Sequence, residues 1–218
     1  MKIKLALAGV ALVFAFQAAQ AKDQLQPAAS YDWAGPYVGV DLGSLWSSTD
    51  VTDNGVLVES NASTNGIVGG VLVGFNHQDG QMVIGLEGDF GLSDAHGTGV
   101  AAILPAVPNE YDLEWTGHAR ARLGFAPDEG PLLLFVAGGL AVSRFQFTEG
   151  ESGDKMSKTY VGGSLGAGAE YGFSESLSAR LEYVYDNFGM GSGLIAIHDY
   201  KAKLQEQSTL RASLNLQF

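Results

Sequence analysis

The chain has 218 residues, of which 46% are hydrophobic, 17% are charged and 30 are glycine. Lysine and arginine number 12 against 24 aspartate and glutamate residues, and the net charge of −12 argues against nucleic-acid binding, which relies on basic patches. The chain holds no cysteine, which excludes disulfides, thiolate metal sites and a cysteine nucleophile.

The N-terminus has the pattern of a secretory signal peptide. Two lysines precede an apolar run over residues 5–16, and an A-x-A cleavage motif ends at Ala21. The run is too short for a membrane-spanning helix, which needs about 20 apolar residues. We therefore predict a cleaved signal peptide over residues 1–21, a periplasmic linker over residues 22–32 and one domain over residues 33–218. Cleavage would remove two lysines and no acid, so the mature charge is 10 − 24 = −14.

From residue 33 onward, apolar and polar residues alternate in one segment after another. Near the end of the chain, for example, Leu181 and Tyr183 share one face of a segment while Arg180 and Glu182 share the other. This is the period of a β-strand with one apolar and one polar face. Eight such segments are predicted as strands: residues 33–46, 66–76, 82–91, 111–126, 132–147, 158–172, 177–187 and 203–218.

The segment 132–147 is the least regular of the eight. Arg144 falls in phase with the apolar Leu132 at the start of the segment. We predict a β-bulge near Gly138 and Gly139 that shifts the phase, because glycine within a strand often marks a bulge.

The connections between the segments alternate in length. The short ones are residues 76–81, 126–131 and 172–177, and the long ones are 47–65, 92–110, 148–157 and 188–202. Short turns at one rim and long loops at the other are typical of an outer-membrane barrel. Aromatic residues gather at segment ends, as lipid headgroups favour: Trp33, Trp46, Phe75, Phe90, Trp115, Phe125, Tyr160, Tyr171, Tyr185 and Phe218. We predict an all-β, eight-stranded antiparallel transmembrane outer-membrane β-barrel, with a soluble sheet as the alternative.

An eight-stranded barrel is just wide enough for side chains to fill its interior. The polar faces of the segments carry both signs of charge, which predicts an ion-pair network across the bore. Its candidate members are Glu87, Asp89, Glu114, Arg120, Arg122, Glu170, Arg180, Glu182 and Arg211, with Asp112 also on a polar face. The same residues could instead line an ion pathway.

The sequence holds no recognisable catalytic or cofactor motif, and we expect neither an enzyme nor a bound cofactor. The four histidines are too scattered for a local metal site, and His118 is expected to be a hydrogen-bonded residue of the bore. His96 and His198 fall in long connections, where they are possible ligands of haem or a metal. The stretch from Asp50 resembles the start of a calcium loop, but it ends on Asn61 where glutamate is required.

Several motifs together resemble one protein family. Residues 33–39 match a W-x-G-x-Y-x-G opening strand, residues 133–141 a strand with a G-G-x-A ending, and residues 166–171 the pattern G-x-G-x-E-Y. Residues 180–183 and the closing residues 211–218 match as well. The chain is similar to the small outer-membrane β-barrel proteins of Brucella, Bartonella and rhizobial bacteria, known as porin-family proteins or major outer-membrane antigens.

The resemblance implies insertion into the Gram-negative outer membrane by the barrel-assembly machinery, with terminal Phe218 as part of the recognition signal. Leu216 departs from the family, whose members usually carry an aromatic ring there. For such a barrel we also predict that both termini lie in the periplasm and that the partners include outer-membrane lipid and lipopolysaccharide. Family roles include envelope integrity, surface contact and, in some members, haemin binding.

These observations predict a protein with a structural role in the envelope that presents four extracellular loops for surface interactions. A passive channel for small solutes is one alternative. Binding of haemin or a cation by the loops, through His96 and His198, is another.

Overall fold

The computed structural model of the chain describes residues 31–53, 56–99, 109–148, 155–188 and 200–218. The predicted signal peptide and the linker up to residue 30 lie outside the described residues, as does His198.

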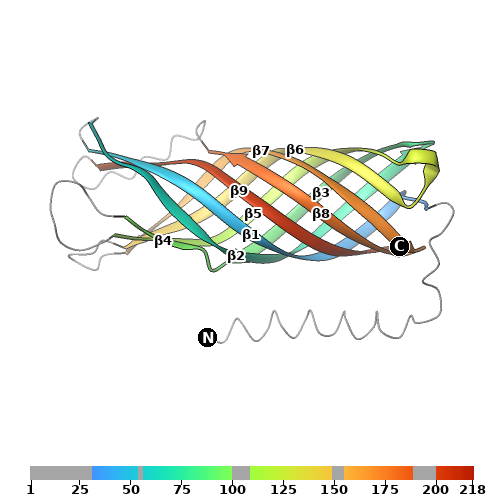
Figure 1. The fold of residues 1–218 in the computed structure, drawn as a ribbon, viewed down its shortest axis with the longest axis horizontal. Helices are drawn as coiled ribbons and strands as arrows, with labels where there is room; N and C mark the ends of the chain where they lie inside the picture. The colour runs from blue at the N-terminus through green and yellow to red at the C-terminus, as the bar shows by residue number, and fades with distance from the viewer. Residues whose placement is uncertain (1–30, 54–55, 100–108, 149–154, 189–199) are drawn as a thin grey trace.

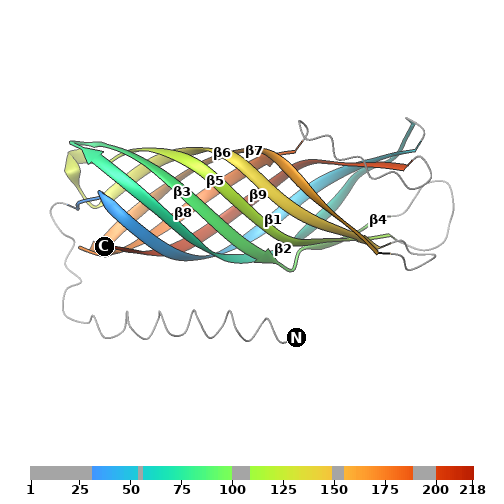
Figure 2. The same cartoon turned by 180° about the vertical axis from the view of Figure 1, so that it is seen from behind.

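The described residues form a closed antiparallel β-barrel (Figures 1 and 2). Its strands are β1 (Gly35–Asp53), β2 (Val56–Asp79), β3 (Met82–Ser93), β4 (His96–Gly99), β5 (Asn109–Phe125), β6 (Leu132–Thr148), β7 (Lys155–Ser174), β8 (Leu177–Asn187) and β9 (Tyr200–Gln217). Closure comes from the pairing of β1 with both β2 and β9. Because β3 and β4 both pair with β2 and β5, they are two pieces of one barrel strand, interrupted at Asp94 and Ala95. The prediction of an eight-stranded antiparallel barrel is therefore confirmed.

The two ends of the barrel differ (Figure 1). One end, the turn end, holds Gly80 and Gln81 between β2 and β3, the 3-10 helix η1 (Pro127–Glu129), the turn between β7 and β8, and the chain terminus at Phe218. Gly80 has a φ of +57°, which glycine adopts at little cost. The opposite end, the loop end, carries the longer connections.

The strands at the loop end are longer than predicted. Residues 47–65, expected to be a loop, are almost entirely strand: β1 continues to Asp53, and β2 begins at Val56. The pairing runs from Ser47 opposite Thr64 to Asp53 opposite Val56. The apolar alternation stops where the sheet leaves the hydrophobic band, whereas backbone hydrogen bonding continues without it. Periodicity therefore marked the membrane band rather than the ends of the strands.

The outer wall of the barrel is apolar over its middle. Large apolar side chains there are exposed: Leu42, Ile67, Val71, Val73, Ile84, Leu86, Leu123, Leu134, Val136, Leu140, Val161, Leu165, Leu181, Leu210 and Leu214. An exposed apolar surface of this extent is not stable in water and indicates contact with lipid. The described residues contain no helix long and apolar enough to cross a membrane.

The predicted bulge at Gly138 and Gly139 is wrong. The pairing of β6 with β5 and β7 is continuous through both glycines. Arg144 does share the outward face of Leu132, but it lies near the loop end, beyond the apolar band, so no phase shift is needed. The bulge lies in β5 instead, where the register shifts between Leu113 and Trp115.

Most of the predicted aromatic residues do face outward. Trp46, Phe90 and Trp115 lie toward the loop end, whereas Phe75 and Phe125 lie toward the turn end. Tyr171, Tyr185 and Phe218 are also at least partly exposed.

Two of the predicted girdle residues are inside the barrel. Trp33 is 1% exposed and Tyr160 is 6% exposed. Tyr160 occupies an inward position of β7, in phase with Ser164 and Glu170, and Trp33 belongs to a segment that enters the bore before β1 begins.

The facing of β8 yields a direct test. Leu181 lies in the middle of β8 with 56% of its surface exposed. Leu181→Arg should lower the free energy of unfolding in lipid by about 2–4 kcal/mol, because it places a charge at the hydrocarbon midplane. Urea unfolding in phospholipid vesicles measures the change.

The matched control is Asn187→Arg, an outward and exposed position at the loop end of the same strand. It should cost about 0–1 kcal/mol, as for charges near the interface. Equal costs for the two variants would contradict the assigned depth of Leu181.

Candidate functional site in the bore of the barrel

Ion pairs fill the middle of the bore. Arg120 from β5 donates from Nη1 to Glu182 Oε1 at 2.7 Å and from Nη2 to Glu87 Oε1 at 2.9 Å. Arg211 from β9 donates from Nη2 to Glu182 Oε2 at 2.9 Å and to Asp89 Oδ2 at 3.2 Å. All these side chains are at most 6% exposed, so the charges compensate one another rather than being solvated by water.

A second group of ion pairs surrounds Glu170 on the turn-end side. Its Oε2 accepts hydrogen bonds from Arg122 Nη2 at 2.5 Å and from Arg180 Nε at 3.0 Å. Its Oε1 accepts from Ser178 Oγ at 2.5 Å and from Asn215 Nδ2 at 2.7 Å. Both oxygens of this buried carboxylate are therefore fully used, as a charge in a low-dielectric interior requires.

Arg180 joins the two groups. Besides Glu170, its guanidinium contacts Glu87 Oε2 through Nη1, and Tyr37 donates its hydroxyl proton to the same oxygen at 2.8 Å. The guanidinium carbons of Arg122 and Arg180 lie 4.0 and 5.2 Å from the centre of the Phe135 ring. The Phe135 ring thus stabilises the positive charges of Arg122 and Arg180 by cation–π contact, in addition to their ion pairs with carboxylates.

His118 extends the network toward the loop end. Its Nδ1 lies 2.6 Å from Asp89 Oδ1, and its Nε2 lies 3.1 Å from Asp186 Oδ2, which also accepts from Gln207 Nε2 at 3.2 Å. His118 was predicted to be a hydrogen-bonded residue of the bore, and these contacts agree with that prediction. Among the described residues, the ion pairs and hydrogen bonds of this network join five carboxylates (Glu87, Asp89, Glu170, Glu182 and Asp186) to four arginines and one histidine.

The structure brings together eight of the nine charged residues predicted for the bore: Glu87, Asp89, Arg120, Arg122, Glu170, Arg180, Glu182 and Arg211. The ninth, Glu114, was placed wrongly. The bulge between Leu113 and Trp115 reverses the local phase, so Leu113 is buried in the bore and Glu114 lies outside, paired with Arg144 at 2.7 Å. Asp112, on the loop-end side of the same bulge, also faces outward, because its Cα partner is the outward Gln146.

Sequence reasoning missed several members of the site. Asp186 is fully buried, and Asp41 lines the bore beside Arg211. Both could have been found from period two alone, since Asp186 is in phase with Glu182, and Asp41 with Tyr37.

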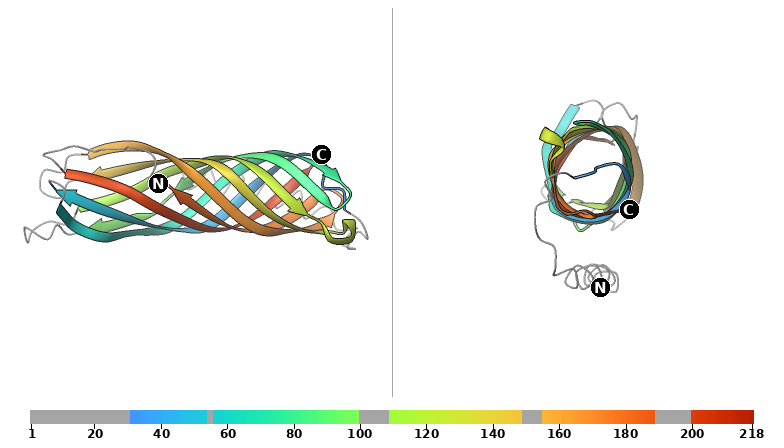
Figure 3. Two further views of the ribbon diagram at one scale, coloured as in Figure 1. Left: turned by 90° about the horizontal axis from the view of Figure 1, so that it is seen from above. Right: turned by 90° about the vertical axis from the view of Figure 1, so that its right-hand side faces the viewer.

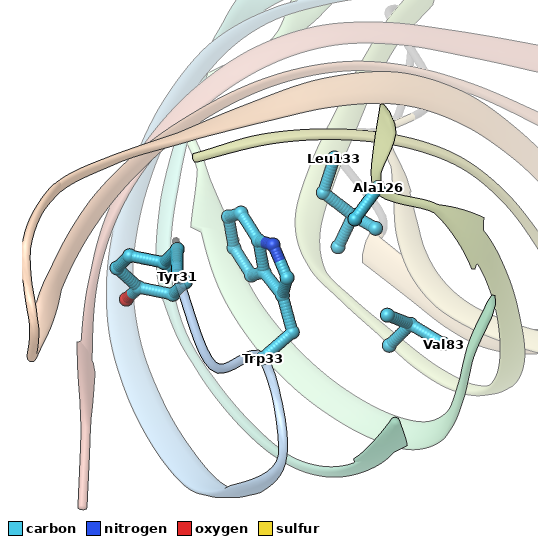
Figure 4. Packing of buried hydrophobic residues seen from close by; sticks show 5 residues of the cluster. All are labelled: Tyr31, Trp33, Val83, Ala126 and Leu133. Carbon is cyan, nitrogen blue, oxygen red and sulfur yellow. The ribbon is translucent and has the colours of Figure 1, made fainter. Parts of the chain in front are cut away.

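The turn end of the bore is closed by an aromatic plug, Tyr31 and Trp33, whose rings lie 4.3 Å apart (Figure 4). They pack against Val83, Ala126 and Leu133. In the end-on view of Figure 3 the described start of the chain crosses the opening of the barrel. Tyr31, the single aromatic residue of the predicted linker, therefore contributes to the barrel interior, where burial raises its pKa to about 12 and keeps it neutral.

Hydrogen bonds attach this plug to three parts of the turn end. The Trp33 amide donates to Gln78 Oε1 at 2.7 Å, and the indole Nε1 donates to the carbonyl of Gly130 at 3.3 Å. Gln217 in β9 donates to the carbonyls of Asp32 and Ala34, both at 2.7 Å. The plug is thus held by the end of β2, by the residue after η1 and by the last strand.

Apolar side chains also fill the loop end of the bore. Leu45, Val68, Ala95 and Leu113 form one cluster. Ala141, Tyr160 and Phe188 form a second, and Phe145 contacts both. The bore therefore has three layers, with ion pairs between two apolar ends.

A cavity of about 10 Å³ remains beside the network, lined by residues that include Asp41, Asp89, His118 and Arg211. This is about the space needed for one water molecule. The arrangement suits charge compensation and rigidity, and it leaves little room for a solute in the part of the bore that the structure describes.

Two other predicted site residues, His96 and Phe218, lie at opposite ends of the barrel. His96 is exposed in β4, and its Nδ1 lies 2.9 Å from the carbonyl of Asp94. The other predicted loop ligand, His198, is outside the described residues. Phe218 is 71% exposed at the turn end, where its amide donates to the carbonyl of Pro36 at 3.0 Å. Within the described ranges, no group of three or more acidic or histidine residues is arranged to hold a metal.

A comparison of two arginines tests the buried network. Arg180→Met removes the cation between Glu87 and Glu170 and leaves uncompensated buried charge, which should cost about 3–5 kcal/mol of unfolding free energy. Arg144→Met breaks a half-exposed pair and should cost about 0–1 kcal/mol. Urea titration of both variants in detergent micelles, monitored by tryptophan fluorescence, measures the difference, and similar losses would refute the role of burial.

A glycine pair tests how tightly the network is packed. A Cβ atom at Gly166 would lie 2.6 Å from Glu182 Oε1 and 2.8 Å from Arg120 Nη1, whereas a Cβ at Gly163 on the same strand meets nothing within 4 Å. Gly166→Ala should therefore destabilise the barrel by about 1–3 kcal/mol through overpacking. Gly163→Ala should change the same unfolding midpoint little. If Gly166→Ala behaves like its control, the bore is looser than described.

Comparison with known proteins agrees with this architecture. Residues 8–218 match the outer membrane protein beta-barrel domain family. The chain is 31% identical over 209 residues to the 31 kDa outer-membrane immunogenic protein of Brucella melitensis, covering 88% of this chain and 86% of that protein. It is 35% identical over 155 residues to a 22 kDa outer membrane protein of Rhizobium leguminosarum, covering 71% of this chain and 66% of that protein.

A solved structure shares the fold. The crystal structure of Neisserial surface protein A aligns with a TM-score of 0.51 and 14% identity, covering 85% of this chain and 98% of that one. Together with the closed barrel and its apolar outer wall, the family match shows that this chain is an outer-membrane β-barrel protein of the outer membrane protein beta-barrel domain family.

Proposed function

We propose that this protein is a non-conducting structural element of the outer membrane that presents its loop end to the exterior for surface interactions. The observation that carries the proposal is the filled bore, in which buried ion pairs lie between two apolar layers. Such a bore stiffens the barrel and opposes the passage of ions. The proposal includes no catalysis, and the names of the relatives refer to outer-membrane and immunogenic proteins.

The proposed orientation places the turn end and both termini in the periplasm. Its support is the asymmetry of the barrel, because bacterial outer-membrane barrels have short periplasmic turns and longer extracellular loops. The barrel-assembly machinery is the expected partner during insertion, with the exposed Phe218 ring at the turn end as part of its signal. Outer-membrane lipid and lipopolysaccharide are the expected partners afterwards.

The channel and the haemin receptor have less support. A channel would require the aromatic plug and the ion pairs to move together, and the cavity beside them has a volume of only about 10 Å³. For haemin, the exposed His96 already has one ring nitrogen close to a backbone carbonyl.

Planar-bilayer recordings test the proposal. The purified barrel, shown to be folded by heat-modifiable migration on a gel, should produce no conductance steps above the membrane baseline at neutral pH. A large porin added afterwards to the same membrane verifies that insertion events are detected. Reproducible steps from the wild-type protein that disappear with the heat-denatured sample would overturn the non-conducting function and favour the channel.

A further inference from the structure

Strands β1 and β9 form the one neighbouring pair of the barrel that no turn or loop connects directly. With β3 and β4 counted as one strand, each of the other seven pairs consists of strands that follow one another along the chain. The β1–β9 pair, which we call the seam, is held by non-covalent contacts alone. The first and last residues of a domain lose their order easily unless further contacts fix them. The turn end of the seam, where β1 begins and β9 ends, is therefore the place at which the barrel wall is most readily opened.

The turn end of the seam is poor in backbone hydrogen bonds. The register between the two strands ends with Tyr37 opposite Gln217. Beyond that pair, the Phe218 amide donates to the carbonyl of Pro36 at 3.0 Å, but Pro36 has no N–H to donate in return. Gly35 has a φ of +122°, which lies outside the extended region and which glycine adopts at little cost. The backbone therefore leaves the barrel wall at Gly35, and the ladder of hydrogen bonds does not continue past it.

Side-chain hydrogen bonds continue the seam where the ladder ends. Residues 31–34, which we call the strap, turn from the wall into the bore (Figure 4). Gln217 in β9 donates from Nε2 to the carbonyls of Asp32 and Ala34, both at 2.7 Å. Asp32 Oδ1 in turn accepts from the Ala34 amide at 2.9 Å, which fixes the turn within the strap. A side chain of the last strand thus holds the residues that precede the first strand.

Trp33 anchors the strap on the opposite side of the bore. Its side chain is 1% exposed and packs against Val83 in β3 and Leu133 in β6. The indole Nε1 donates to the carbonyl of Gly130 at 3.3 Å, and the Trp33 amide donates to Gln78 Oε1 at 2.7 Å. A buried ring with a hydrogen-bonded N–H is a strong anchor, because it combines a large apolar contact with a fixed orientation.

Tyr31 adds a third attachment, to β7. Its ring is 3% exposed and lies 4.3 Å from the ring of Trp33. A Cβ atom at Gly172 in β7 would overlap the Tyr31 ring, so the ring lies directly against the backbone of that strand. The strap therefore contacts β2, β3, β6, β7 and β9 at once. These strands lie side by side with the required spacing only after the barrel has closed.

We propose that the strap is a clamp for the seam, which ties the start of β1 to the end of β9 and to the opposite wall and keeps the turn end of the barrel closed. Gln217 supplies the contact with the seam, and Trp33 supplies the anchor. Because the clamp forms only on a closed barrel, it slows opening rather than speeding closure.

Hydrogen–deuterium exchange of the folded barrel in detergent micelles, resolved by mass spectrometry of peptic fragments, tests the clamp. Gln217→Met removes both donors that hold the strap and keeps the length of the side chain. The amides at the turn end of the seam, in residues 37–42 and 212–216, should exchange about tenfold faster, as expected for the loss of two hydrogen bonds. Trp33→Ala, which removes the anchor, should accelerate the same amides at least as much.

The β5–β6 pair is the internal reference, because it also borders the strap at the turn end but is joined by the connection over residues 126–131. Its amides in residues 121–125 and 134–138 should exchange as in the wild type. The control variant is Gln81→Met, the same change at an exposed residue between β2 and β3, and it should leave the seam unchanged.

Heat-modifiable migration verifies that each variant is folded, and Gln217→Met decides the test if Trp33→Ala does not fold. Unchanged exchange at the seam in a folded variant would overturn the clamp. An equal acceleration of the seam and the β5–β6 pair would also overturn it and make the strap a filler of the bore. These rates depend neither on conduction nor on orientation in the membrane, so the outcome is independent of the conductance test.

Discussion

The hydrocarbon of a membrane offers no hydrogen-bond partner to a strand edge, and the architecture of this protein follows from that constraint. The sheet has to close, and it does so by pairing β1 with β9 from Tyr37 opposite Gln217 to Asp53 opposite Tyr200. Closure around eight strands leaves an interior of side-chain width. Any charge on the inner face must then find its partners among the other inner side chains.

The ion-pair network satisfies this second requirement. Each buried carboxylate is matched by guanidinium, imidazole, amide or hydroxyl groups on other strands, so the network connects parts of the sheet that are distant along the barrel wall. The apolar layers at the two ends exclude water from these pairs, which strengthens their attraction. The filled bore is thus both the core of the protein and the reason to propose that it does not conduct.

One irregularity in β5 connects the interior with the outer surface. The bulge before Trp115 turns Leu113 into the loop-end apolar cluster and turns Glu114 out toward Arg144. Because of the bulge, Leu113 supplies an apolar group to the bore and Glu114 supplies a carboxylate to the outer wall. This local exception to period two therefore changes both the packing of the bore and the charge on the outer wall.

Period two, the signs of the charges and the alternation of turns and loops determined the barrel class, the number of strands and eight of the nine predicted network residues, because these follow from local alternation against a lipid phase. Only the tertiary structure decided the pairings within the network, the burial of Trp33 and Tyr160, the bulge in β5 and the extension of β1 and β2 beyond the apolar band. Each of these depends on which strands become neighbours. A pattern along one strand records which face a residue occupies, whereas cross-strand register determines what it meets there.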